Sequence, residues 1–414
     1  MKNITDKFYY LRSEWKKGPE ILFFSALLLF LIHTQMFDIN WTNKIAVHVM
    51  AAVLDIVAVL CVLYAVLVVF QLKKSIPVFL LTAVFMALFL MGWSGWSYYV
   101  RSTTAAVFLI LMAGGRNYRS ILKCFLIVLL GGYFTALLGL ALHFSKDLSK
   151  TDTYGVGYSC GYIHPNTAAL YLFLILLLIW YLFLRNRKLP VLLLFWGAVI
   201  PVWFYMKCRT ISGLLVCFPL LAMHCEKTLR SEKRMAVRQN SRSWKILMIS
   251  MPLLFFLLSL FLCRQMEFLT AVFEKTPVWN MACRFVQGGI AFSWYGVTLV
   301  GHPIDSSGAI AMELAGYVEP LLFLDNVYIS ELIYRGLIGA ALELMYLSAV
   351  NFKCIRTKDL ALLTISNVLL LFGLMEHYTI FPAYNFTLIY LFAGDMVEVY
   401  YRAAGNDDPP AHTN

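Results

Sequence analysis

The chain has 414 residues, of which 61% are hydrophobic and 14% charged, and its mean hydropathy is +0.73. So little polar surface cannot cover a water-soluble globule, and the composition therefore excludes a soluble protein and indicates an integral membrane protein. The net charge of +11 does not indicate a nucleic-acid partner, because the basic residues form short clusters between apolar segments, as in the cytoplasmic loops of membrane proteins.

The first half of the sequence predicts six membrane spans that alternate in direction. A basic head over residues 1–18 is expected to stay in the cytoplasm. The apolar segment after it lacks a small-residue cleavage site, so we expect it to remain as an anchor. The predicted spans cover residues 19–36, 44–71, 75–100, a short segment that ends before residue 116, 121–144 and 166–184.

The second half predicts six further spans around two long connections. The first connection, residues 226–245, is the most basic loop, and the second, residues 265–327, is a long outer loop. The seventh span ends near residue 207, and the eighth begins near residue 211. The ninth covers residues 246–263 and the tenth residues 328–350, and the eleventh and twelfth lie before and after residues 377–385.

These segments together predict an all-α polytopic membrane protein of about twelve transmembrane helices, at about 20 residues per span. One membrane domain is expected over residues 19–402, with a polar tail over residues 403–414 and both termini in the cytoplasm. Residues 278–300 are long enough to cross the membrane but contain Arg284. Since an arginine at mid-membrane costs about 2.5 to 3.5 kcal/mol, this segment is expected to lie in or near the outer interface.

The longest polar interruption, residues 266–339, is where we expect the active site. Near its end, Asp325 and Asn326 stand just ahead of an apolar segment. If that segment is helical, the three-residue and four-residue spacings put Tyr328, Glu331 and Arg335 on one face, which a lipid-facing helix would not tolerate.

Three arginines, Arg209, Arg284 and Arg335, are predicted on the outer side, against the positive-inside bias. A guanidinium group matches the geometry of phosphate and carboxylate, so these residues indicate an anion site. The alternatives are contact with lipid headgroups and, for Arg335, an i,i+4 pair with Glu331.

Histidines and a capping signal lie on the same predicted side. In Gly161–Thr167, Pro165 favours a helix start and Asn166 or Thr167 can cap it, while His164 either contacts substrate or is simply solvated. His302 and His377 are further candidates on this side.

Asp325 has two interpretations. It caps the following helix, or it is a general base that takes a proton from an attacking hydroxyl near the arginines. Asp55, Glu343 and Asp395 fall inside spans, where carboxylates link helices or carry protons in transporters. Nine cysteines without a Cys-x-x-Cys pair and eight histidines without His-Glu-x-x-His give no metal or redox motif, so no cofactor is predicted.

The order of these features resembles the superfamily of O-antigen ligases and O-antigen polymerases. The resemblance covers roughly residues 75–395 and rests on Cys208-Arg-Thr-Ile-Ser-Gly, on Arg284, and on the stretch from Asp325-Asn-Val-Tyr to Arg335-Gly-Leu-Ile-Gly. The segment Gly161-Tyr-Ile-His-Pro-Asn-Thr is similar to one that many capsule and exopolysaccharide polymerases carry, which favours the polymerase branch.

The resemblance implies a GT-C-like fold and an inverting, metal-independent glycosyl transfer at the outer face of the bacterial plasma membrane. The donor would be a polyisoprenyl-diphosphate-linked oligosaccharide. The partners would be a flippase, a chain-length regulator and the lipids of the membrane. Arg209 and Arg284 would stabilise the diphosphate leaving group, and Asp325, where ligases carry a histidine, would be the base. His164, Asn166, His302, Asn326, Tyr328 and Arg335 would contact substrate.

Overall fold

The chain forms two compact units, one from residues 1–146 with 392–414 and the other from residues 147–391. Whether the two units form the single membrane domain expected over residues 19–402 depends on how they join, so that expectation stays a prediction. The computed structural model describes residues 18–42, 45–72, 98–114, 116–147, 150–152, 155–185, 241–276, 279–302, 310–314, 317–322 and 324–393.

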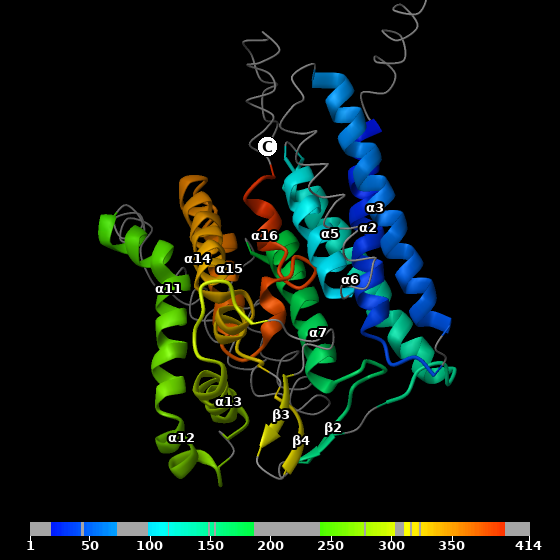
Figure 1. Cartoon of the computed structure of the whole chain (residues 1–414). Coiled ribbons are helices and arrows are strands. Elements are labelled where there is room, and N and C mark those ends of the chain that lie inside the picture. The colour runs from blue at the N-terminus through cyan, green and yellow to red at the C-terminus, as the bar shows by residue number, and fades with distance from the viewer. Residues whose placement is uncertain are drawn as a thin grey trace, which may run out of the picture. The chain divides into compact units, whose positions relative to one another are not determined.

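In the first unit, α2 packs against three neighbouring helices (Figure 1). One contact between α2 and α6 is polar: Gln35 is buried and donates from Nε2 to the Leu129 carbonyl at 3.0 Å. Gly132 makes room for it, because a Cβ there would collide with the Gln35 amide. The helices are α2 (Gly18–Phe37), α3 (Ile45–Leu72), α5 (Tyr98–Met112) and α6 (Tyr118–Ala141).

The second unit combines helices with two short antiparallel hairpins (Figure 1). The hairpins pair β1 (Lys150–Asp152) with β2 (Gly155–Gly157) and β3 (Ile310–Leu314) with β4 (Tyr317–Leu322). Its helical elements are α7 (Pro165–Ile179) with the π-helical extension η2 (Trp180–Leu184), α11 (Arg242–Arg264), α12 (Met266–Phe273), α13 (Trp279–Tyr295), α14 (Val327–Arg356), α15 (Leu360–Phe372), the 3-10 turn η4 (His377–Ile380) and α16 (Thr387–Tyr390).

Hydrogen bonds at the helix ends give the relative directions of four helices of this unit, α7, α11, α14 and α15. At one end, Asn326 at the start of α14 donates to Ser259 near the end of α11. At the other end, Asn351 late in α14 donates to the Met248 carbonyl early in α11 at 2.9 Å. Tyr181 of η2 likewise reaches Asp359 at the start of α15. α7 and α14 therefore run one way and α11 and α15 the other, the alternation that the sequence predicts.

Helix α14 is broken at Gly336, a feature that the sequence analysis does not predict. Gly336 has φ 70° and ψ −173°, which only glycine adopts without strain. The segment around Gly301 packs into the break, where Leu337 N donates to the Thr298 carbonyl at 2.9 Å and His302 N donates to the Ile333 carbonyl at 3.0 Å. The interrupted backbone is thus satisfied by protein, as a membrane helix requires.

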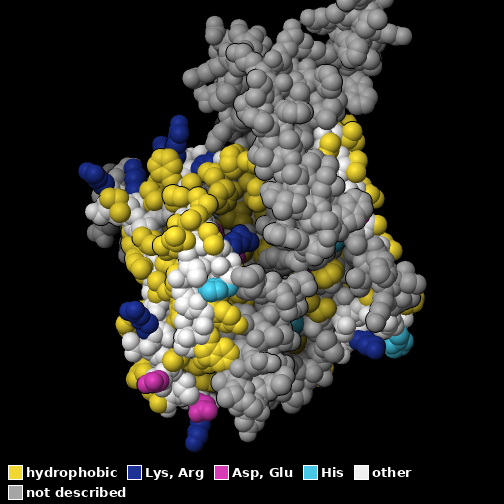
Figure 2. All heavy atoms as spheres, in the orientation of Figure 1, with side chains coloured by type: hydrophobic (Ala, Val, Ile, Leu, Met, Phe, Trp, Pro, Cys, Tyr) yellow, Lys and Arg dark blue, Asp and Glu magenta, His cyan; other side chains and the backbone are white. Residues whose placement is uncertain are grey.

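The described residues contain five helices that are long and apolar enough to cross a membrane: 18–37, 118–141, 165–184, 242–264 and 327–356. Large apolar side chains are exposed on several of them, including Phe134, Phe261 and Met345. Figure 2 shows hydrophobic side chains over much of the described surface. Exposed apolar surface on this scale fits a lipid environment, so the chain is a largely helical membrane protein, as predicted.

The expected spans correspond closely to several of these helices. The spans predicted over residues 19–36, 121–144, 166–184 and 246–263 match α2, α6, α7 with η2, and α11 within a few residues. α13 is not among the candidate spans, while the predicted outer loop contains α12, α13 and the β3–β4 hairpin. Of the span expected at 75–100, residues 75–97 lie outside the described residues, and so do the spans expected to end near residue 207 and to begin near residue 211.

Candidate functional site

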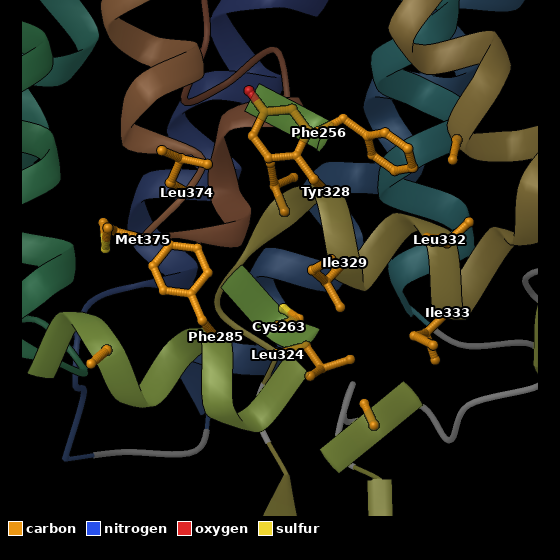
Figure 3. Close-up of a cluster of buried hydrophobic side chains, with 14 of the residues drawn as sticks. Phe256, Cys263, Phe285, Leu324, Tyr328, Ile329, Leu332, Ile333, Leu374 and Met375 are labelled. Carbon is orange, nitrogen blue, oxygen red and sulfur yellow. The ribbon is translucent and has the colours of Figure 1, made fainter. Parts of the chain in front are cut away.

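A cluster of apolar side chains fixes the positions of three charged residues that come from distant parts of the sequence. The cluster includes Phe285 of α13, Leu324 ahead of α14 and Met375 after α15, and Figure 3 shows these three among its members. Each is next in sequence to a charged residue, respectively Arg284, Asp325 and Glu376. Apolar packing therefore carries the charged side chains to one place.

Arg284 is the centre of the charged group. Its side chain is 13% exposed, and its Nη2 donates to Glu376 Oε1 at 2.8 Å and lies 3.4 Å from Asp325 Oδ2. Its Nε donates to the carbonyl of Met375. Burial alone would lower the pKa of the guanidinium, but the two carboxylates outweigh this effect and raise the pKa, so Arg284 carries a fixed positive charge.

Glu376 is the most buried member of the group, with a side chain 4% exposed. Besides Arg284, Asn166 of α7 donates from Nδ2 to Glu376 Oε1 at 2.9 Å. Burial raises the pKa of this carboxyl to about 7, against the lowering effect of Arg284 and of both hydrogen bonds. A carboxyl group with such a pKa exchanges a proton near neutral pH.

Asp325 is the more accessible carboxylate, 29% exposed, and His377 Nδ1 lies 3.9 Å from its Oδ1. Burial and the charge of Arg284 lower the pKa of His377 although Asp325 raises it, so the imidazole is neutral at pH 7. The group thus contains one fixed cation, two carboxyl groups and one neutral imidazole.

Asn326, and not Asp325, caps α14. Its Oδ1 accepts from Ile329 N at 3.2 Å, and its Nδ2 donates to Ser259 Oγ at 3.0 Å and to the Leu374 carbonyl at 3.2 Å. The interpretation of Asp325 as the helix cap is therefore wrong, because the neighbouring amide occupies the capping position. Asn326 is buried and structural, whereas Asp325 remains directed to Arg284 and His377.

His164 caps α7, which corrects the expectation that Asn166 or Thr167 does so. His164 Nδ1 accepts from Asn166 N at 3.1 Å, and Pro165 occupies the first helical position. With capping provided by His164, the Asn166 amide is available to Glu376. His164 therefore holds the start of α7, the helix that carries Asn166.

The other predicted site residues lie elsewhere or have structural contacts. Tyr328 is buried, and its hydroxyl donates to the Leu370 carbonyl at 2.8 Å. Arg335, 41% exposed, pairs with Glu331 at 2.8 Å, the i,i+4 alternative that the sequence offered. His302 packs at the break in α14, its ring 5.5 Å from that of Tyr295. Arg209 lies outside the described residues.

Glu376 is the functional candidate that the sequence analysis missed. The signal was an acidic residue at the end of an apolar run, directly before His377 and the predicted turn 377–385. An ionisable side chain next to an apolar membrane segment is unfavourable unless it has hydrogen-bonding or ionic partners. The partners, Asn166 and Arg284, lie far away in sequence.

The arrangement fits anion binding combined with proton transfer. Arg284 can hold an anion, and the two carboxyl groups beside it can accept a proton. Among the described residues, no group of three His, Cys, Asp or Glu side chains is arranged to hold a metal ion. Comparisons with protein-family models, with curated proteins and with solved structures find no match to this chain.

Proposed function

We propose that the chain is an oligosaccharide repeat-unit polymerase of bacterial surface polysaccharide, such as capsule, exopolysaccharide or O-antigen. It transfers a polyisoprenyl-diphosphate-linked glycan to a lipid-linked acceptor. The observation that carries the proposal is the convergence of Arg284, Asp325, Glu376 and Asn166 from four separate segments. The sequence resemblance supplies the substrate class.

In this proposal the chemistry follows from the charges. A hydroxyl of the acceptor sugar attacks the anomeric carbon of the donor while the bond to the diphosphate oxygen breaks, which inverts the configuration. Asp325, the more exposed carboxylate, accepts the proton of the attacking hydroxyl. Arg284 stabilises the negative charge that grows on the diphosphate, which favours the transition state over the ground state.

The same proposal includes a GT-C-like fold of about twelve spans in the bacterial plasma membrane, with both termini cytoplasmic. The positions of basic residues support this orientation. Arg185 pairs with Asp359 at 3.4 Å, and Lys353 and Arg356 close α14, all at the helix ends opposite to Arg284. The positive-inside rule then puts the charged group on the outer side, where a flippase would deliver the donor and a chain-length regulator would act.

Deleting the gene in its host and sizing the surface polysaccharide tests the proposal. A strain without a polymerase should carry single repeat units, and the wild-type gene should restore long chains. Long chains that are not attached to their final acceptor would indicate a ligase. Unchanged polymer in an Arg284→Ala strain would contradict an enzymatic role for this group.

A flippase or proton-coupled transporter is the second candidate. Glu331, Arg335 and Glu343 favour it, because all three are ionisable side chains within the candidate span 327–356, and Arg335 pairs with Glu331 there at 2.8 Å. Purified protein in liposomes with lipid-linked oligosaccharide distinguishes the two. Product lengthening without translocation supports the polymerase, and translocation without lengthening supports the transporter.

A further inference from the structure

The guanidinium of Arg284 is already occupied by carboxylates. Its Nη2 contacts Glu376 Oε1 at 2.8 Å and Asp325 Oδ2 at 3.4 Å. An incoming phosphate must compete for this nitrogen. If both carboxyl groups are ionised, their charges exceed that of Arg284, and the group repels an anion.

Anion binding therefore requires that one carboxylate loses its charge or moves away. Glu376 is held by two partly buried partners, Asn166 and Arg284, and its own side chain is 4% exposed. Asp325 is 29% exposed, so water stabilises its charge better. A neutral Glu376 keeps a carbonyl oxygen that still accepts from Asn166, so protonation does not dismantle the local structure.

We propose that Glu376 takes up one proton when a diphosphate diester binds at Arg284, and that Glu376 is thereby a positioning residue that removes one of the two negative charges beside the guanidinium. The inference rests on the proposed function and adds a residue and a proton to it. The proton comes from solvent, and the Glu376 carboxylate becomes a neutral carboxyl group. The positive charge of Arg284 is then balanced by the bound diester.

The neighbouring titratable groups fit this assignment. Glu376 faces Arg284 of α13, with Cys283 beside it, and Asp325 ahead of α14. His377 follows it in the chain and is neutral at pH 7, because burial lowers its pKa. Burial raises the pKa of Glu376 to about 7, so its proton is exchanged in the range where binding can be measured.

The sign of the pH dependence follows from linkage. Below pH about 7 Glu376 already holds its proton in the free protein, so affinity should be constant. Above that pH a proton must be taken up on binding, so the dissociation constant should rise about tenfold per pH unit until the pKa of the bound state is reached.

The experiment measures binding of a dialkyl diphosphate diester, whose charge is constant over this range, to the full-length protein in nanodiscs. Calorimetry between about pH 6 and pH 9, in two buffers of different ionisation enthalpy, gives both the affinity and the number of protons taken up. Wild type should show uptake of about one proton above neutral pH. Glu376→Gln keeps the acceptor oxygen, and should bind independently of pH and more tightly than wild type at the alkaline end.

Two variants separate Glu376 from its neighbours. His377→Gln leaves both carboxyl groups in place and should retain the alkaline weakening, whereas Asp325→Asn removes one of the two negative charges and should reduce it. Melting curves of all variants check that they fold. A flat wild-type profile, or an unchanged slope in Glu376→Gln, overturns the inference while leaving the proposed function intact. No binding of the diester to wild type at any pH overturns both.

Discussion

The two adjacent residues Asp325 and Asn326 give the sharpest test of the site, because the structure assigns one to function and the other to stability. Asn326→Ala removes the cap of α14, at a cost of about 1 kcal/mol. It also removes two buried hydrogen bonds, to Ser259 and to the Leu374 carbonyl, each worth about 1 kcal/mol. The free energy of unfolding should therefore fall by about 3 kcal/mol.

Asp325→Asn should have the opposite profile. Its ion pairs, 3.4 Å to Arg284 and 3.9 Å to His377, are partly exposed. Their loss should change the free energy of unfolding by less than about 1 kcal/mol. If Asp325 is the general base, transfer activity should fall about 10²- to 10⁴-fold.

Unfolding by SDS in mixed micelles measures stability, and elongation of a lipid-linked repeat unit measures activity. Asn326→Ser is the matched control, because its hydroxyl can cap the helix but cannot reproduce the two amide hydrogen bonds, so it should recover about 1 kcal/mol. Equal destabilisation by Asp325→Asn and Asn326→Ala would show that Asp325 belongs to the fold. An Asn326→Ala protein as stable as wild type would refute the capping argument.

Three further variants follow from particular contacts. Arg284→Lys keeps the charge but cannot reproduce the bidentate fork, so elongation should fall steeply, whereas Lys at the exposed Arg264 should leave it unchanged. Gly336→Ala should destabilise the protein by several kcal/mol in the same SDS assay, because the backbone strain alone costs about 1–3 kcal/mol and the new Cβ would also collide with Gly301 N. Gly131→Ala is the control, since the space at its Cβ is open and its stability should not change. Asn166→Ala removes a donor that lowers the pKa of Glu376, so the pH above which diester binding weakens should rise.

The spans could be predicted because an apolar helix must be about 20 residues long to cross a membrane. α7 with η2 and α11 follow directly from that requirement. The break in α14 could not be predicted, because a glycine within a helical sequence pattern does not show which φ angle it adopts. That angle depends on the segment around Gly301, which packs against Gly336 from another part of the chain.

The candidate site was predicted in part for a related reason. Arg284 and Asp325 could be selected from sequence, since charged residues next to apolar segments need a reason to be there. Glu376 became visible only through its contact with Arg284, 92 positions earlier in the chain. The alternatives for Asp325 were likewise decided by Asn326, because only the backbone shows which of two adjacent polar residues caps the helix.

The burial of the Arg284–Glu376 pair bears on why such a group exists in so apolar a unit. A buried ion pair is weak evidence for stability, because well-packed apolar residues in its place are often neutral or stabilising. The neighbouring side chains Phe285, Leu324 and Met375 already provide the packing that holds these segments together. The ion pair therefore adds little stability beyond what its apolar neighbours provide. Its contribution lies in holding a fixed cation and an exchangeable proton side by side, which is what an anion site coupled to proton transfer needs.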